Sequence, residues 1–191
     1  MDEQQAITIR EAHVADAPQM GRFMVHTWLT AHRDHLPAAA WERRRTTWTA
    51  ADSANGWLRH LQERDVAAES AKACYLVAED ANQHLVGLAA ASAVAGVDRG
   101  RLGEVGSLYV DQTRQRRGIG RRLLRQIAAQ LRSRGVTRLQ IAVLDANHDA
   151  CRFYEALGGE WVGNRLFDED GDLLPERLYC WPDITALLRD H

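Results

Sequence analysis

Two periods of hydrophobic and polar positions alternate along the chain, which indicates a mixture of strands and helices. Residues 7–10 alternate between apolar and polar side chains, as expected of a short first strand. Apolar residues then recur at spacings of three and four over residues 20–31, behind Asp16 and Pro18. An acidic residue followed by proline resembles an N-cap and a first helical turn, so an amphipathic helix is expected here.

The rest of the pattern predicts two further helical regions, a short helix and six strands. A helical region is expected within residues 38–69, with Asn55-Gly56 as its interruption. The later elements are a hairpin over 74–79 and 84–94, a strand over 104–110, a helix over 119–133, a buried strand over 139–144, a helix over 150–157, and two strands within 160–181 around the acidic turn 168–172. No repeat or linker is visible, so residues 1–191 are expected to form one mixed α/β domain with its core in 7–181.

Charge is distributed unevenly in a way that the overall composition hides. The net charge of -2 argues against a dedicated nucleic-acid binder. Nine arginines and no acidic residue lie between Gln112 and Arg138, so this segment carries +9 and the remainder carries -11. A nucleic-acid role through this segment would show a steep dependence on salt. The acidic remainder makes that role unlikely.

Cysteine usage and hydropathy favour a protein of the reducing cytoplasm. Cys74, Cys151 and Cys180 are odd in number and widely spaced, which suggests neither a disulfide framework nor a zinc site. The most apolar run, residues 85–97, is shorter than the roughly 20 residues that span a bilayer. Neither a metal nor a membrane partner is therefore expected.

A glycine-containing loop lies between the predicted strand 104–110 and the amphipathic helix 119–133. Gly118 and Gly120 allow the backbone to turn tightly, and the first N–H groups of a helix are unpaired donors. With the helix dipole and the adjacent arginines, such a loop suits a pyrophosphate. A solvated basic helix after a tight turn is the plainer alternative. Neither the nucleoside-triphosphate P-loop motif nor the dinucleotide motif is present.

These residues resemble the GNAT superfamily of acyl-CoA-dependent N-acetyltransferases. Residues 115–120, Gln-Arg-Arg-Gly-Ile-Gly, match its Q/R-x-x-G-x-G/A signature, and residues 108–111 and 147–158 look like its other core motifs. The resemblance implies a mixed α/β fold with a central, mostly antiparallel β-sheet flanked by helices. The implied order is strand, two helices, three strands, helix, strand, helix and two strands.

The resemblance also implies acetyl-CoA as cosubstrate and a set of residues that bind it. The backbone of Leu108 and Val110 would pair with the pantetheine arm, with the Leu108 N–H near the thioester carbonyl. The loop would hold the pyrophosphate, and Asn147 would hydrogen-bond the pantetheine arm. The implied binding residues are Leu108, Tyr109, Val110, Gln115, Arg116, Arg117, Gly118, Ile119, Gly120, Arg121, Asn147 and Tyr154.

Two catalytic residues follow from the same resemblance. Tyr154 would protonate the departing thiolate, a role that suits a phenol because its ordinary pKa of about 10 is not far above that of a thiol. Glu104 would be the general base, acting directly or through water, because an alkylammonium must lose a proton before it attacks. Ordinary packing for Tyr154 and a solvent-facing strand end for Glu104 are the alternatives.

The acceptor is expected to be a primary amine of a small molecule or peptide, attacked directly in a ternary complex. A protein N-terminus or lysine is an alternative acceptor, and a non-catalytic acyl-CoA sensor is an alternative function. Four of the six tryptophans lie within the first 57 residues, and Trp28 and His32 are the candidate acceptor contacts. A homodimer through the C-terminal strands is implied by the resemblance.

Overall fold

A computed structural model describes residues 7–66, 73–94 and 101–189. It contains one open seven-stranded sheet in the order β1-β2-β3-β4-β5-β7-β6. All neighbouring strands are antiparallel except β4 and β5, which are parallel. The strands are β1 (Thr8–Glu11), β2 (Ala73–Glu79), β3 (Leu85–Ala93), β4 (Leu102–Val110), β5 (Arg138–Leu144), β6 (Glu160–Glu169) and β7 (Asp172–Trp181). The mixed, mostly antiparallel sheet predicted from the sequence is thus confirmed.

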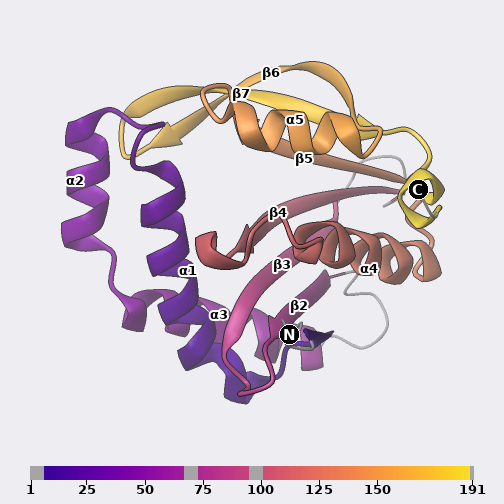
Figure 1. Ribbon diagram of the computed structural model, residues 1–191, viewed down its shortest axis with the longest axis horizontal. Coiled ribbons are helices and arrows are strands. Elements are labelled where there is room, and N and C mark those ends of the chain that lie inside the picture. The colour runs from indigo at the N-terminus through magenta and orange to yellow at the C-terminus, as the bar shows by residue number, and fades with distance from the viewer. Residues whose placement is uncertain (1–6, 67–72, 95–100, 190–191) are drawn as a thin grey trace, which may run out of the picture.

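Helices cover both faces of the sheet. The helices are α1 (Ala17–His32), α2 (Ala38–Thr47), α3 (Ala50–Val66), α4 (Ile119–Ser133) and α5 (His148–Ala156). Helices α1 and α3 pack against each other, and α4 packs on β2, β3 and β4 (Figure 1). The largest apolar cluster lies between α4, α5 and the sheet, and it includes Leu123, Ile127 and Trp181, each fully buried. No helix among the described residues is long and apolar enough to cross a membrane.

The first helices differ from the prediction in one respect. The predicted interruption at Asn55-Gly56 is wrong, because both residues lie inside α3. The break falls at Trp48, whose extended backbone separates α2 from α3. Thr49 and Asp52 then start α3 by exchanging hydrogen bonds, Asp52 N to Thr49 Oγ1 at 3.1 Å and Thr49 N to Asp52 Oδ2 at 3.2 Å. This capping box outweighs the weak helix propensity of asparagine and glycine. Three α-helices therefore precede β2 in the described residues, where two were predicted.

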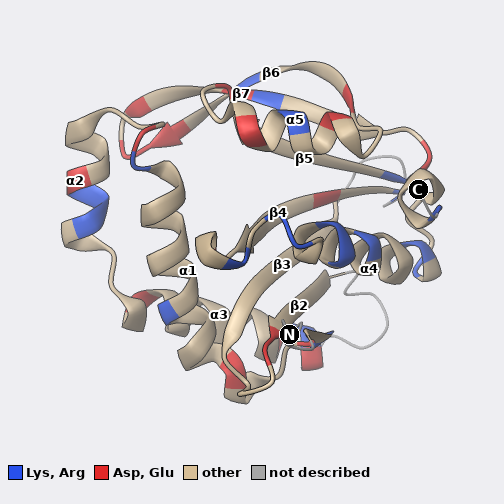
Figure 2. Ribbon diagram, in the orientation of Figure 1, with Lys and Arg blue, Asp and Glu red and all other residues tan. Residues whose placement is uncertain are grey.

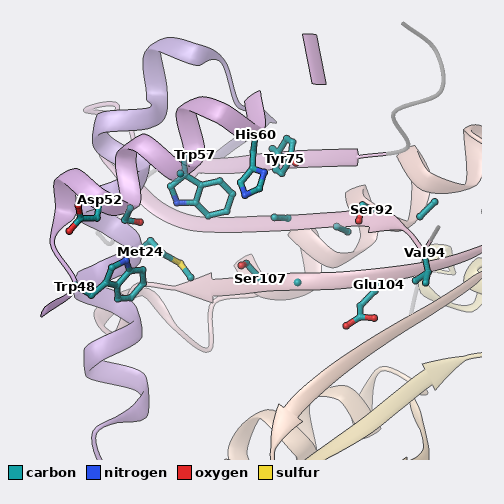
Figure 3. A pocket seen from close by; sticks show the side chains of 16 residues that line it. Met24, Trp48, Asp52, Trp57, His60, Tyr75, Ser92, Val94, Glu104 and Ser107 are labelled. Carbon is teal, nitrogen blue, oxygen red and sulfur yellow. The ribbon is translucent and has the colours of Figure 1, made fainter. Parts of the chain in front are cut away.

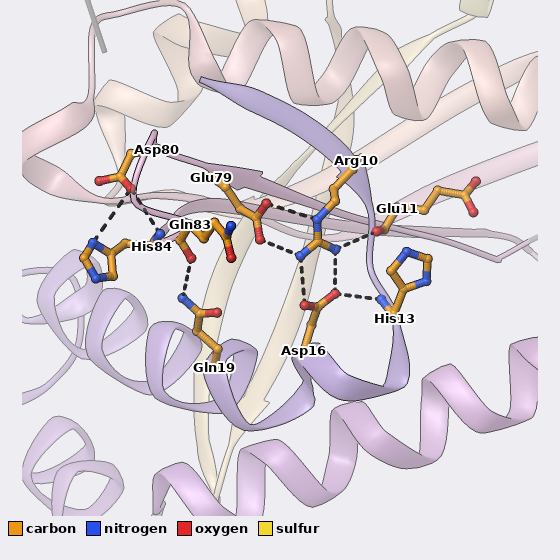
Figure 4. A network of polar contacts seen from close by, with 9 residues as sticks. All are labelled: Arg10, Glu11, His13, Asp16, Gln19, Glu79, Asp80, Gln83 and His84. Carbon is orange, nitrogen blue, oxygen red and sulfur yellow. Dashed lines mark hydrogen bonds and ion pairs between the residues drawn. The ribbon is translucent and has the colours of Figure 1, made fainter. Parts of the chain in front are cut away.

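The start of α1 is held by an ion-pair network instead of a simple cap. Asp16 makes no side-chain cap bond to α1. Its carboxylate accepts bonds from Arg10 at 2.7 and 2.9 Å and from the backbone N–H of His13 at 2.7 Å. Arg10 also binds Glu79 (Figure 4). The bond from Arg10 lowers the pKa of Asp16. This network joins β1, β2 and the entry to α1.

Candidate active site

Strands β4 and β5 pair only over their first residues. Parallel pairing joins Leu102–Val105 to Arg138–Ile141 and then stops, although β4 continues to Val110. Beyond that point β5 is paired on its other side with β7, and the two strands diverge (Figure 1). The part of β4 after Val105 therefore has no β5 partner in the ladder. Such an unpaired edge can accept an extended molecule as an added strand.

A β-bulge marks the place where β4 and β5 part and the opening between them begins. On the β3 side of β4, Ala91 pairs with Val105 and Ala90 pairs with Ser107, so Gly106 is left over. An extra residue bends a strand and increases its twist. The bulge thus coincides with the end of the β4–β5 ladder and contributes to the divergence of the two strands.

The loop before α4 lies at the carboxyl end of β4, beside the opening. Gly118 is the N-cap of α4 with a φ of 78°, and Arg116 has a φ of 60°. Both angles are left-handed, which turns successive backbone N–H groups toward one side, as in the anion-binding loops of other proteins. The Gln115 side chain donates to the Val110 carbonyl at 3.2 Å and ties the loop to β4. Arginine residues follow along α4, where the ribbon is blue (Figure 2).

Helix α5 places Asn147 and Tyr154 at the carboxyl end of β5. Asn147 is the N-cap of α5, and its Oδ1 accepts from the Ala150 N–H at 3.1 Å. Tyr154 lies one and a half to two turns further on, buried among the rings of Phe153, Tyr179 and Trp181. Burial raises the pKa of Tyr154, which keeps the phenol protonated. A protonated phenol is the form that donates a proton.

Gly120 lies against the ring of Phe153. A Cβ added to Gly120 would lie 3.4 Å from the end of that ring, at van der Waals contact. The first turn of α4 therefore packs directly against α5. This packing brings the loop and the Asn147–Tyr154 segment to the same opening.

Glu104 lies on β4, two residues before the bulge, with both carboxylate oxygens engaged. Arg165 Nη1 on β6 is 2.9 Å from Oε1, and Gln140 Nε2 on β5 is 2.7 Å from Oε2. Arg165 also binds Glu176 at 2.7 Å. These contacts fix the carboxylate at the edge of a cavity, where it keeps further lone pairs free to accept a proton.

The cavity opens between α1, α3 and the strands β2, β3 and β4, and its volume is about 730 Å³. One end is aromatic and the other carries Glu104 (Figure 3). It reaches β4 at Gly106 and Ser107, where the opening between β4 and β5 begins. The residues that line it are Met24, Trp48, Asp52, Ser53, Gly56, Trp57, His60, Tyr75, Ala90, Ala91, Ser92, Ala93, Val94, Glu104, Gly106 and Ser107.

The residues predicted from the sequence as acceptor contacts, Trp28 and His32, are not among those lining residues. Trp28 is buried, stacks on His32 at 4.6 Å between ring centroids, and meets Trp48 edge to face at 5.7 Å. Burial lowers the pKa of His32. Trp28 thus packs against Trp48, which itself lines the cavity, and His32 packs on Trp28.

Sequence reasoning missed the contribution of α3 to this cavity. Asp52, Gly56 and His60 recur every fourth residue and all line it, as do Ser53 and Trp57 one position along. Residues four apart share a helix face. The sequence signal that could have revealed it is a polar and aromatic stripe along α3. Trp57 and Leu61 on the same helix are buried. Among the described residues there is no cluster arranged to hold a metal ion.

Comparisons with known proteins agree with this geometry. The sequence model of a protein family, the acetyltransferase (GNAT) family, matches residues 33–159. A curated relative, the uncharacterized N-acetyltransferase YuaI of Bacillus subtilis, is 27% identical over 181 residues, which cover 95% of this chain and 96% of that protein.

Two solved structures show the same fold at lower identity. The protein yncA of Salmonella typhimurium, solved with acetyl-CoA, has a TM-score of 0.69 at 20% identity, over 97% of this chain and 96% of that one. A phosphinothricin acetyltransferase of Sinorhizobium meliloti, also solved with acetyl-CoA, has a TM-score of 0.67 at 22% identity, over 93% and 88%.

Proposed function

The chain belongs to the acetyltransferase (GNAT) family, and from this premise we propose that it transfers the acetyl group of acetyl-CoA to a primary amine of a small molecule or peptide. We assign the whole chain to one N-acetyltransferase domain. The observation that carries the proposal is the convergence of three features at one place. The β4–β5 ladder ends at Val105, α4 begins beside that opening, and the cavity reaches β4 at Gly106 and Ser107.

The residues at the opening fit acetyl-CoA. The free edge of β4 from Leu108 to Val110 suits the pantetheine arm, which carries amide donors and acceptors spaced along an extended chain. The loop from Gln115 to Arg121 suits the pyrophosphate, because the α4 dipole and the arginine charges favour an anion there. The Asn147 side chain uses Oδ1 for its cap, which leaves its amide N–H groups to donate to the arm. When bound, acetyl-CoA supplies an activated acetyl thioester.

Three residues of the chain then assist direct transfer of the acetyl group from acetyl-CoA to the amine in a ternary complex. Glu104 at the cavity edge accepts a proton from the ammonium of the acceptor, directly or through one water. The Leu108 N–H donates to the thioester oxygen and stabilises the negative charge that develops there. Tyr154, kept protonated by burial, donates a proton to the thiolate as it leaves. No acyl-enzyme is required, so the cysteines have no part in the reaction.

The test is release of free thiol from acetyl-CoA in the presence of a panel of amines, with coenzyme A binding measured separately by calorimetry. Amine-dependent thiol release is expected. Binding of coenzyme A without thiol release would favour an acyl-CoA sensor, and the absence of both would overturn the proposal.

A pair of glycine variants tests the loop itself. Gly118 and Gly135 both have left-handed φ angles, 78° and 86°, at opposite ends of α4, with no atom within 4 Å of an added Cβ. Alanine at either position is expected to cost about 1–2 kcal/mol of backbone strain. Only Gly118→Ala should also weaken coenzyme A binding, by about tenfold, the factor for 1.4 kcal/mol. Equal affinities in the two variants would contradict the assigned pyrophosphate site.

A homodimer through β6 is part of the proposal. β6 is the last strand of the sheet, so one of its edges is unpaired by any other strand in the described part of the chain. Trp161, Val162 and Leu166 on β6 and Leu173 on β7 are more than half exposed. Exposed apolar side chains along a long edge strand favour association with another chain. Light scattering of the purified protein tests this, and a monomer at micromolar concentration would contradict it.

We also propose a cytoplasmic location. All three cysteines are free thiols, and Cys74 and Cys151 are buried. Free buried thiols are typical of proteins kept in a reducing compartment. Localisation of a tagged chain by fractionation would test this.

A further inference from the structure

The charges around the acceptor cavity are unbalanced, and this imbalance restricts the class of amine that fits. Among the described residues that line it, two are carboxylates, Asp52 and Glu104, and none is lysine or arginine. Asp52 uses one oxygen, Oδ2, for the N–H and hydroxyl of Thr49 at the start of α3. These bonds lower the pKa of Asp52, so it stays ionised.

Arginines near the cavity do not cancel these charges. Arg165 at Glu104 is shared with the buried Glu176, so one guanidinium serves two carboxylates. The pair of carboxylates and the single arginine leave one negative charge at this end of the cavity.

The arginines behind the aromatic end have partners of their own. Arg44 lies 5.2 Å from the Trp48 ring centroid and pairs with Glu169 at 2.6 Å. Arg64 lies 5.8 Å from the Tyr75 ring and pairs with Asp65. Neither arginine is a lining residue. An anionic group in the cavity would therefore find neither Arg44 nor Arg64 free to pair with it.

The aromatic end is suited to an apolar body attached to a cation. His60 stacks on Tyr75 with an interplanar angle of 25°, and Trp57 meets Tyr75 edge to face at 6.1 Å. Trp48 and Met24 continue this wall (Figure 3). Faces of tryptophan and tyrosine attract ammonium groups and bury methylene chains or rings, whereas they offer a carboxylate nothing in exchange for its hydration.

We propose that the acceptor is a cationic amine with an apolar or aromatic body and no acidic group. The inference rests on the proposed acetyltransferase function and names the substrate class of that site. Amino acids and other acceptors that carry a carboxylate, phosphonate or phosphinate beside the amine are excluded by the same charges. The lining selects against them because their acid group would meet a carboxylate at either end of the cavity, Glu104 or Asp52, and no lysine or arginine among the described lining residues.

The experiment compares pairs of acceptors that differ only in a carboxylate. The pairs are phenethylamine and phenylalanine, tryptamine and tryptophan, and cadaverine and lysine. In each pair the acid-free amine is expected to have a kcat/KM about thirtyfold higher or more, the factor for one like-charge contact at roughly 8 Å with an effective dielectric constant of about 20. Equal or faster acetylation of the acids would overturn the inference.

Binding of the same pairs, measured by calorimetry in the presence of coenzyme A, separates this inference from the proposed function. Preferential binding of the acid-free amines without thiol release would support the inference while the proposed function fails. Thiol release with equal binding of both members of each pair would overturn the inference while the proposed function stands.

A matched pair of variants places a charge inside the cavity. Gly56 lines the cavity from α3, and an added Cβ there would meet no atom within 4 Å. Gly56→Arg adds a cation, and Gly56→Gln adds a side chain of similar length without one. The amine-to-acid ratio of kcat/KM is expected to fall at least about tenfold in Gly56→Arg relative to Gly56→Gln, because the cation offers the acid a partner and repels the amine. An identical ratio in the two variants would overturn the inference.

Discussion

The two halves of the proposed active site, the donor half for acetyl-CoA and the acceptor half for the amine, are built by different means. The donor half, residues 102–157, offers mainly backbone groups: the free edge of β4, the loop before α4 and the N-cap of α5. The acceptor half, formed by α1–α3 with β2 and β3, offers side chains from several elements around the cavity. Backbone geometry tolerates changes in side chains, whereas a side-chain pocket is altered by single substitutions. Under the proposed function, the donor half would therefore serve acetyl-CoA while the acceptor half would set the specificity for the amine.

Removal of the Tyr154 hydroxyl is the strongest test of the donor half. Tyr154→Phe should lower kcat by about 10²- to 10⁴-fold, because the departing thiolate loses its proton donor. Coenzyme A affinity should stay within about threefold, since the ring and its packing remain. Because burial raises the pKa of Tyr154, the wild-type rate should not fall through loss of this proton below about pH 10. An unchanged kcat would make Tyr154 a packing residue.

Glu104 lies where the two halves meet, and its loss should affect turnover more than binding. Glu104→Gln should lower kcat by about 10²-fold, because no carboxylate is left to accept the proton of the ammonium. Glu176→Gln is the control, since it removes the other carboxylate on Arg165 without altering a lining residue. Steady-state kinetics with saturating acetyl-CoA measure both. Equal losses in the two variants would assign Glu104 a structural role.

Truncation of one aromatic side chain tests whether the acceptor half acts separately. Trp48→Ala should raise the KM of the acceptor about tenfold, the size expected for loss of one cation–π and apolar contact. Trp41→Ala is the control, because Trp41 lies on α2 but does not line the cavity. The dissociation constant of coenzyme A should be the same in both variants and in the wild type. A weaker coenzyme A complex in Trp48→Ala alone would show that the halves are coupled.

The ion pair at the base of the acceptor half should matter for stability and little for catalysis. Asp16→Asn should lower the free energy of unfolding at pH 7 by about 1–2 kcal/mol, because Arg10 loses a charged partner. The pKa of Asp16 is lowered in the folded state, so its contribution is present above the ordinary value near 3.9 and is lost as the pH falls through the lower folded value.

Urea unfolding at pH 7 and below pH 3 measures this effect. The difference between wild type and Asp16→Asn should shrink at the lower pH. A difference that persists there would mean that packing, and not charge, is the source. The coenzyme A affinity of the folded variant should equal that of the wild type.

The donor half could be predicted closely from the sequence because its signals are local. Gly118 predicts a left-handed turn, and a strand, a loop and an amphipathic helix follow one another without a gap. The predicted helix 119–133 coincides with α4, and the predicted strand 104–110 lies within β4. Each of these features depends on neighbours in the sequence, so no tertiary contact is needed to recognise it.

The acceptor half was predicted less well, because its arrangement depends on contacts between distant segments. The break before α3 is set by the Thr49–Asp52 capping box, which the Asn55-Gly56 pair obscured. Four early tryptophans are visible in the sequence, yet only the folded chain shows that Trp48 and Trp57 line the cavity while Trp28 packs against Trp48 and does not line it. Which face of a helix is buried depends on the partner that packs against it.

The sequence by itself determined the family, the sheet with its flanking helices and the place of the glycine-containing loop before α4. Hydrophobic periodicity and turn residues act over a few positions, so they can be recognised in the sequence without knowledge of the folded structure. Tertiary structure alone decided where β4 parts from β5, how Arg165 is shared between Glu104 and Glu176, and which charges line the cavity. The β4–β5 register and the Arg165–Glu104 pair join residues more than thirty positions apart, and only packing sets their distances.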